Sequence, residues 1–215
     1  MSLDKSKAIE RSVDSVAKIY AIIIGLALSE AVKALIVKNA DGKMDLSPPT
    51  LWSGAPAFLA FVFTLVPFWH GMNRHLDRCY LEKTTSVVQG ALLLDFGVFF
   101  VEASVFLIAA WALRSDLVTF YCLGIIFLLD VIWGAVSHQI HFPGEKSHAI
   151  SWSAINIVAI LLMLGVITFR FDPKQPVLMA IAIVRTIVDY RNGRYFYFPA
   201  GAKLSGAAAA KVKDS

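Results

Sequence analysis

Long apolar stretches recur along this chain of 215 residues, and they constrain its fold more than any other feature. A helix needs about 20 mostly apolar residues to cross the hydrocarbon core of a bilayer. The sixth of the stretches is short and contains Arg185 and Asp189. We therefore predict an all-α, polytopic membrane helix bundle with about six transmembrane helices, formed by residues 19–36, 54–70, 87–113, 117–136, 149–169 and 176–190.

The composition supports a chain that lipid solvates. Hydrophobic residues make up 57% of the chain and charged residues 17%, against about 45–50% and about 25% in soluble domains. A soluble core of this size could not bury so much apolar surface. The net charge of +4 does not predict nucleic-acid binding, because the basic residues follow the predicted topology. The lipid bilayer is the partner that the composition indicates.

The distribution of lysine and arginine predicts the orientation, since cytoplasmic loops carry the excess of these residues. With six spans, the side that holds both chain ends carries Lys5, Lys7, Arg11, Arg74, Arg78, Lys83, Lys146, Arg191, Arg194, Lys203, Lys211 and Lys213. The other side carries Lys38, Lys43, Arg114, Arg170 and Lys174. Both termini are therefore predicted to be cytoplasmic. Residues 1–200 are predicted to form one transmembrane domain, and residues 201–215 a flexible cytoplasmic tail. Short loops and internal termini suit a bacterial or archaeal inner membrane.

Four acidic residues fall inside the predicted spans: Glu30, Asp95, Glu102 and Asp130. A charged side chain at the bilayer centre costs about 2.5–3.5 kcal/mol on insertion scales and normally faces a partner helix or a water-filled cavity. Asp95 and Glu102 are seven residues apart and share one helix face. They could form steps in a cation or proton path. Alternatively, they could pair with basic residues on other helices, and Glu30 could pair with Lys33 three residues later.

A second group of polar residues is predicted at the inner leaflet, where three helices end. It consists of His70, Arg74, Asp77, His138, Arg185 and Asp189. The convergence of these polar side chains from three helices favours a binding function. The alternative interpretation is a belt of salt-bridged side chains at the membrane interface.

No catalytic or metal-binding motif stands out. Three histidines, His138, His141 and His148, occur in eleven residues, but their spacing matches no metal-binding motif, so no metal is predicted. Cys79 and Cys122 are predicted at opposite faces of the membrane and cannot form a disulfide with each other. The chain has no HExxH motif and no recognisable Ser/His/Asp order, so no enzymatic activity is assigned.

The buried acidic residues and the lack of a soluble domain favour a small ion channel or transporter, assembled as a homo-oligomer. One alternative is a non-catalytic subunit or effector of a larger membrane complex. Another is a redox subunit that binds haem b or a quinone, with His70 or His75 and His138 or His141 as axial ligands.

Two segments carry a resemblance to a known family. Residues 11–15, followed by residues 21–23, and the Phe68-Trp69-His70 sequence resemble the six-helix repeat of lysosomal and bacterial potassium channels. The resemblance covers two helices and implies cation conduction. The Phe-Ser-Asp signature of that family is absent, because Val13 and Asp14 stand in its place.

Overall fold

The computed structural model describes residues 3–36, 44–82, 90–115, 117–142, 148–170 and 174–199, with side chains from residue 7 in the first range and from residue 150 in the fifth. Every regular element in these ranges is helical. The elements are α1 (Leu3–Ile36), α2 (Pro48–Leu76), η1 (Asp77–Glu82), α3 (Ala91–Trp111), α4 (Val118–His141), α5 (His148–Thr168), α6 (Lys174–Asn192) and α7 (Arg194–Tyr197). The predicted tail, residues 201–215, lies outside the described residues.

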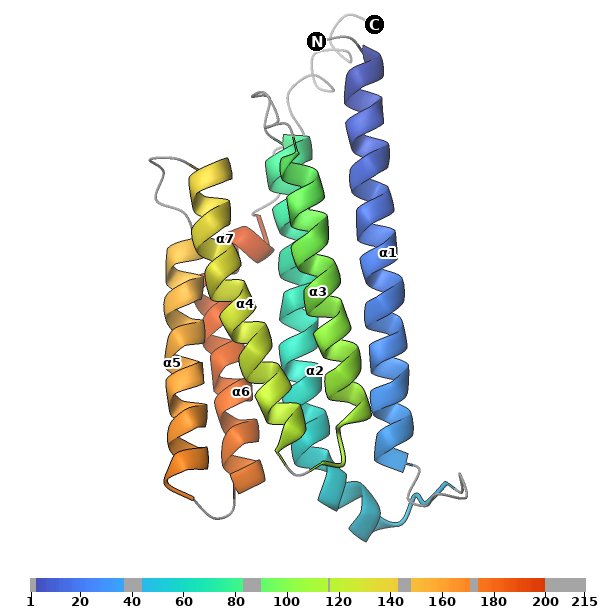
Figure 1. Ribbon diagram of the computed structural model, residues 1–215, viewed down its shortest axis with the longest axis vertical. Helices are drawn as coiled ribbons and strands as arrows, with labels where there is room; N and C mark the ends of the chain where they lie inside the picture. Colours follow the sequence, from blue (N-terminus) through green and yellow to red (C-terminus); the bar gives the residue numbers. More distant parts are fainter. Residues whose placement is uncertain are drawn as a thin grey trace, which may run out of the picture.

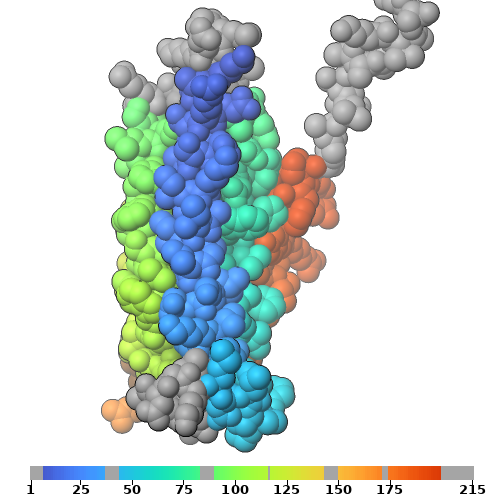
Figure 2. Space-filling model, turned by 90° about the vertical axis from the view of Figure 1, so that its right-hand side faces the viewer, coloured from blue at the N-terminus to red at the C-terminus, as the bar shows by residue number. Residues whose placement is uncertain are grey.

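The six long helices alternate in direction and lie side by side (Figure 1). We call the end at which α1, α3 and α5 begin the N-terminal end of the bundle, and the other the opposite end. The helix α1 packs on the outside against α2 and α3, and Figure 2 shows it lying along one face between them. On the other side, α4, α5 and α6 complete the bundle, and the short helix α7 folds back near the N-terminal end.

Five of the described helices are long and apolar enough to cross a membrane: Lys7–Ile36, Pro48–Glu82, Ala91–Trp111, Val118–His141 and Ile150–Thr168. This confirms the prediction of a multi-pass helical bundle. In lipid, a helix satisfies all backbone hydrogen bonds within one segment, which is why apolar stretches of this length fold this way. The helix α6 is not among the five because of its charged residues, so the sixth span and the orientation stay predictions.

The exposure pattern is the reverse of that in a soluble protein. Large apolar side chains such as Ile22, Leu93 and Leu161 are more than half exposed on the outside of the bundle. Several ionisable and polar side chains, among them Asp95, Asn156 and Arg185, are by contrast almost completely buried inside it. Lipid can solvate an apolar exterior, whereas buried polar groups require partners. The interior is therefore where a polar site must be sought.

A proline in α2 fixes the position of α6. Pro67 lies inside α2 and lacks the N–H that would otherwise bond to the carbonyl oxygen of Phe63, four residues earlier. The hydroxyl of Thr186 in α6 donates a hydrogen bond to this oxygen instead. Neighbouring helices commonly satisfy backbone groups that a proline frees within a membrane. This contact places Arg185 beside the centre of α2.

Candidate functional site

A group of polar side chains lies together in the middle of the bundle. We call it the central network, and it consists of Glu102 from α3, Asp130 from α4, Asn156 from α5, and Arg185 and Asp189 from α6. None of these residues is more than 4% exposed. Sequence analysis had predicted Glu102 and Asp130 as one group and Arg185 and Asp189 as part of another. The structure brings the two pairs together at a single site.

Hydrogen bonds connect Asp130, Asn156 and Arg185, and an ion pair joins Asp189 to Arg185. The side-chain amide of Asn156 donates to Oδ2 of Asp130, and its Oδ1 accepts from Nε of Arg185 at 2.8 Å. Nη1 of Arg185 lies 3.3 Å from Oδ2 of Asp189. The hydroxyl of Tyr197 in α7 donates to the same oxygen at 2.8 Å. Asn156 thus bridges an acidic residue on α4 and a basic residue on α6.

The guanidinium group of Arg185 is held between aromatic rings. Its central carbon lies 5.1 Å from the centroids of both Phe68 and Phe127. Neither Nη1 nor Nη2 has a hydrogen-bond partner within the described part of the chain. Cation–π contacts are strongest in desolvated surroundings such as these. The geometry fixes the charge of Arg185 in the bundle while leaving hydrogen-bond donors available.

Glu102 is less well satisfied than the other acidic residues. It is 2% exposed, and its Oε1 has no hydrogen-bond partner among the residues that the structure describes. Asp130 is close enough to interact with it electrostatically. The nearby hydroxyl of Tyr20, from α1, is buried and also lacks a partner within those residues. Because a lone buried carboxylate is costly, Glu102 needs a proton or a bound cation.

Asp95 belongs to a separate cluster near the N-terminal end of the bundle. Its Oδ2 accepts hydrogen bonds from Nε2 of His75 at 2.9 Å and from the hydroxyl of Tyr80 at 2.8 Å. The same oxygen lies 3.6 Å from Nε2 of His141, and Sγ of Cys79 lies 3.7 Å from Nδ1 of His75. We call these five residues the thiol–imidazole cluster.

The two groups are separated by aromatic side chains. Phe99 lies on α3 between Asp95 and Glu102, which are seven residues, or about 10 Å, apart along the helix axis. Its ring packs against Trp133 with a centroid distance of 6.1 Å. Both acidic residues face the interior, as their spacing predicted. Among the described residues, neither carboxyl group forms an ion pair with a lysine or an arginine of another helix; Lys33 pairs with Glu30, and Arg185 pairs with Asp189.

The predicted inner-leaflet group is only partly assembled. Arg74 contacts Asp77 at 3.3 Å and Glu82 at 3.0 Å, and its Nε donates to the carbonyl oxygen of Phe196. His70 packs against Tyr190 and Tyr197, with centroid distances of 5.9 and 5.0 Å. His138 is half-buried on α4, one turn before His141. Arg185 and Asp189 lie deeper, in the central network, so the predicted group divides between the bundle surface and its interior.

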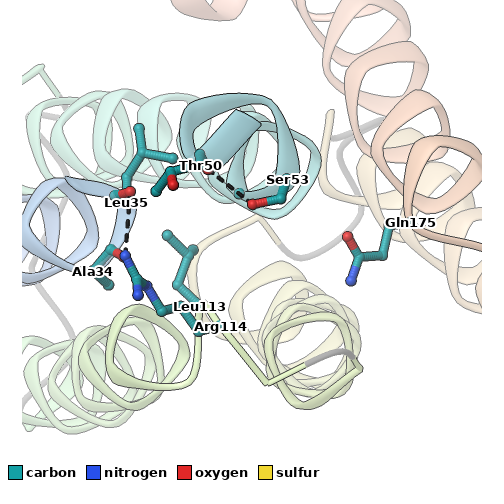
Figure 3. A pocket seen from close by; sticks show the side chains of 8 residues that line it. Ala34, Leu35, Thr50, Ser53, Leu113, Arg114 and Gln175 are labelled. Atoms are coloured by element: carbon teal, nitrogen blue, oxygen red, sulfur yellow. Dashed lines mark hydrogen bonds between the residues drawn. The ribbon is translucent and has the colours of Figure 1, made fainter. Parts of the chain in front are cut away.

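Polar cavities lie near both ends of the bundle. At the N-terminal end, a cavity of about 410 Å³ is lined by residues that include Arg74, Arg78 and Glu82. At the opposite end, a cavity of about 290 Å³ is lined by Ala34, Leu35, Thr50, Ser53, Gly54, Leu113, Arg114 and Gln175 (Figure 3). Arg114 closes one side of it by donating hydrogen bonds to the carbonyl oxygens of Ala34 and Leu35 at the end of α1.

An apolar layer separates the cavity at the opposite end from the central network. Phe61, Phe106, Leu123 and Ile126 are fully buried, and the rings of Phe61 and Phe106 meet edge to face at 5.9 Å. Phe61 precedes Phe68 on α2 by seven residues, about 10 Å along the axis. Apolar side chains thus fill the bundle on this side of the network.

Glu30 is not part of either group. It pairs with Lys33 at 3.6 Å, and the side chains are 36% and 67% exposed. This is the intrahelical pair that their spacing predicted. Of the four acidic residues in the predicted path, Glu30 is therefore the one that the structure keeps at the outside of the bundle.

The rings of His75 and His141, one of the histidine pairs considered as axial haem ligands, are not placed on opposite faces of a porphyrin in this conformation. His75 and His141 come together, but their ring centroids are 5.3 Å apart with an interplanar angle of 83°. Axial histidines bind iron from opposite faces of the macrocycle. Two rings in edge contact leave no room for a porphyrin between them.

Several site residues were not singled out from the sequence. Asn156 lies in a span that has no charged residue. Its polar amide within this apolar stretch was the signal that could have indicated a buried polar site. Tyr197 follows the last predicted span, yet it is 2% exposed and inserted into the bundle. Cys79 was treated as an isolated thiol. Its position four residues after His75, one helical turn, was the signal that could have linked them.

No protein-family model matches this chain, and no curated protein or solved structure matches it either. The resemblance to potassium channels therefore has no support from these comparisons. Any functional assignment has to depend on the geometry.

Proposed function

We propose that this multi-pass membrane bundle is a small ion transporter or channel. We further propose that the carboxyl groups of Glu102 and Asp130 carry protons or a monovalent cation through its centre. The observation that carries the proposal is the charge imbalance of the central network. The network holds three buried carboxyl groups, those of Glu102, Asp130 and Asp189, but only one guanidinium, that of Arg185. If all were ionised, two negative charges would remain uncompensated within the bundle.

Such an imbalance favours exchangeable positive charge at the site. An uncompensated ion in a low-dielectric interior costs several kcal/mol, even after structural relaxation. Protonation of the carboxyl groups, or a cation bound between them, removes this cost. Intramembrane carboxyl groups commonly mark ion pathways and proton relays for this reason. A purely structural network would need only as many acidic residues as it has basic ones.

The arrangement of cavities supports a pathway through the bundle. Polar cavities near the two ends have the central network between them, and the layer around Phe61 and Phe106 lies between the network and the opposite end. We propose that this layer is the closed gate of the described conformation. In this proposal α6 is the sixth span, and both chain termini face the cytoplasm. The protein acts as a homo-oligomer in a bacterial or archaeal inner membrane.

The test is ion flux into liposomes that contain the purified protein. A potassium gradient with valinomycin would impose a membrane potential, and a trapped pH-sensitive dye would report proton entry. A parallel assay with trapped sodium- or potassium-sensitive dyes would identify a cation. We expect Glu102→Gln and Asp130→Asn each to reduce the flux at least tenfold, because each removes one exchangeable charge from the path.

Glu30→Gln is the matched control, because it neutralises an acidic residue that lies outside the network, and it should leave the flux unchanged. Each variant would first be shown to elute as a single species in detergent. Flux that survives the double variant Glu102→Gln/Asp130→Asn would refute the proposed path. Flux that is absent from the wild-type protein for protons, sodium and potassium would refute the proposed function.

A further inference from the structure

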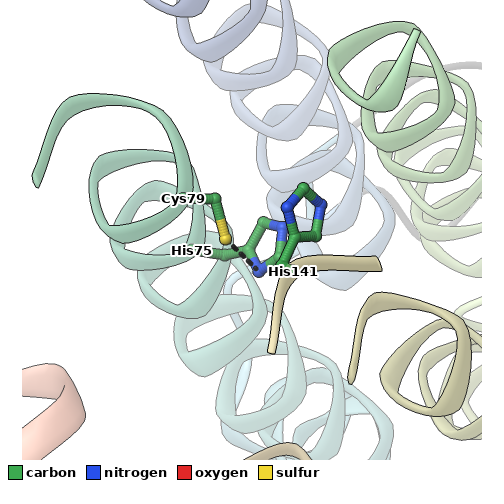
Figure 4. A group of neighbouring side chains, drawn as sticks. All are labelled: His75, Cys79 and His141. Atoms are coloured by element: carbon green, nitrogen blue, oxygen red, sulfur yellow. Dashed lines mark hydrogen bonds between the residues drawn. The ribbon is translucent and has the colours of Figure 1, made fainter. Parts of the chain in front are cut away.

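The thiol–imidazole cluster contains three side chains that ligate transition metals. His75 lies in the last turn of α2, Cys79 lies in η1, and His141 ends α4. Their donor atoms all lie within 4.8 Å of one another. Figure 4 shows the three side chains directed toward one another across the contact of these helices. Near the N-terminal end of the bundle, this cluster is separate from the central network.

The spacing of the donor atoms suits a tetrahedral ion. Zinc binds cysteine sulfur at about 2.3 Å and histidine nitrogen at about 2.0 Å, so two such ligands at a tetrahedral angle lie about 3.5 Å apart. Sγ of Cys79 and Nδ1 of His75 are 3.7 Å apart. Only a small adjustment separates this pair from the geometry of two ligands on one ion.

Asp95 supplies the outer contact that histidine ligands of metals normally have. Nε2 of His75 donates to Oδ2 of Asp95 at 2.9 Å, which leaves Nδ1 on the side of Cys79 as the acceptor. A carboxylate that receives the second ring N–H of a ligating histidine fixes its tautomer and raises its basicity. Tyr80 holds the same oxygen, so the position of Asp95 is itself determined.

The charges also favour a divalent ion. Asp95 is fully buried, and its Oδ1 has no hydrogen-bond partner among the described residues. With a divalent metal bound by the Cys79 thiolate, the negative charges of the thiolate and of the Asp95 carboxylate would balance the two positive charges of the ion. The Cys79 thiol releases its proton to solvent as the sulfur–metal bond forms. Oδ1 of Asp95 then remains as an acceptor for a water molecule on the metal.

The backbone around Cys79 departs from the α-helix. The chain passes from α2 directly into the π-helical turn η1, from Asp77 to Glu82. Short π-helical turns are rare and occur frequently at functional sites. Here the turn places Cys79 beside His75 and Tyr80 beside Asp95.

We propose that His75, Cys79 and His141 bind a divalent transition metal of the zinc class, with Asp95 as the carboxylate that orients the histidines. A Cys–His–Asp arrangement would also suit a nucleophilic thiol. Two observations favour the metal: the second histidine, His141, joins the cluster, and Cys79 is only 5% exposed, which leaves no approach for a substrate. The proposal is independent of ion transport through the central network.

The experiment uses the full-length protein in detergent, after treatment with a chelator. Co²⁺ is the probe, because a cysteine-bound tetrahedral cobalt gives a thiolate-to-metal charge-transfer band and intense visible bands. We expect one Co²⁺ per chain, displaced by Zn²⁺. The charge-transfer band should be lost in Cys79→Ser, and His141→Gln should weaken binding. Asp95→Asn should raise the dissociation constant about 10- to 100-fold, as loss of an outer-shell partner does.

Cys122→Ser and His138→Gln are the matched controls, and both should keep the band. Size-exclusion profiles and circular dichroism would show that each variant is folded. A folded wild-type protein that gives no charge-transfer band, or a band that persists in Cys79→Ser, would overturn the proposal. Rapid alkylation of Cys79 by iodoacetamide that Zn²⁺ does not slow would also overturn it and identify a nucleophilic thiol instead.

Discussion

The pair formed by Arg185 and Asp189 offers a quantitative test of the central network. The two side chains are 1% and 0% exposed, and Nη1 of Arg185 lies 3.3 Å from Oδ2 of Asp189. Removing one partner of a buried ion pair typically costs about 3–5 kcal/mol, because the other charge remains buried and unpaired. We therefore expect Arg185→Gln to lower the free energy of unfolding by that amount.

Two other losses contribute to the effect of Arg185→Gln. Its Nε donates a hydrogen bond to Asn156, and hydrogen bonds that involve a charged group contribute about 1.5–3 kcal/mol. The contacts with the rings of Phe68 and Phe127 contribute about 0.5–2 kcal/mol each. These terms overlap with the cost of the unpaired charge, so we do not add them. They place the effect in the upper part of the expected range.

A double-mutant cycle isolates the interaction between the two charges. We expect the double variant Arg185→Gln/Asp189→Asn to be more stable than the sum of the single variants predicts, by about 1–3 kcal/mol. The matched pair is Lys33→Gln/Glu30→Gln, which removes a more exposed ion pair and should show a coupling of about 0–1 kcal/mol. Reversible unfolding by sodium dodecyl sulfate in mixed micelles, followed by circular dichroism, would measure both. Equal coupling energies in the two cycles would refute the account of the network.

Two further predictions concern packing and pH. Gly97→Ala, with nothing within 4 Å of the new Cβ, should raise the free energy of unfolding by about 0.5–1 kcal/mol, because alanine favours a helix over glycine. Gly71→Ala, whose Cβ would lie 3.0 Å from Trp152, should be less stable than Gly97→Ala by about 1–3 kcal/mol, and the same unfolding assay would compare them. Burial, and then the charge of Asp189, raises the pKa of Tyr197 well above its ordinary value of 10.0. The stability that this proton contributes is complete below pH 10 and is lost at higher pH, at about 1.4 kcal/mol per pH unit. Tyr197→Phe should therefore be less stable than wild type near pH 8 and lose less stability between pH 10 and 11; parallel pH curves for the two proteins would contradict this.

Much of the fold could be predicted from the sequence, because hydropathy is nearly sufficient where lipid is the solvent. Backbone groups in hydrocarbon must bond within their own segment, so a long apolar stretch has few alternatives to a helix. The boundaries were less predictable. The helix α1 begins at Leu3 rather than at residue 19. Its first turns are polar and precede the apolar stretch, so hydropathy alone does not detect them. Similarly, α2 begins at Pro48 rather than at residue 54, since proline is favoured in the first turn of a helix.

The candidate sites were predictable only where a charge interrupted an apolar stretch. Asp95, Glu102 and Asp130 were evident for this reason, and all three are buried. Their partners were not evident, because a pairing between helices depends on the rotation and depth of each helix. Asn156, a neutral amide in the most apolar of the five candidate spans, gives little signal in hydropathy, although it connects the two halves of the network.

The helix α6 shows why a hydropathy average can miss a helix that belongs to the bundle. Its charged residues Arg185 and Asp189 are buried, whereas Val184 and Ile187 on its outer face are each 57% exposed. An average over the sequence counts all four equally, but lipid would contact only the apolar pair. The hydrogen bond from Thr186 to the carbonyl oxygen that Pro67 leaves free then fixes this helix to α2. The polarity of α6 is thus compensated by the central network, and the network in turn depends on α6 for its positive charge.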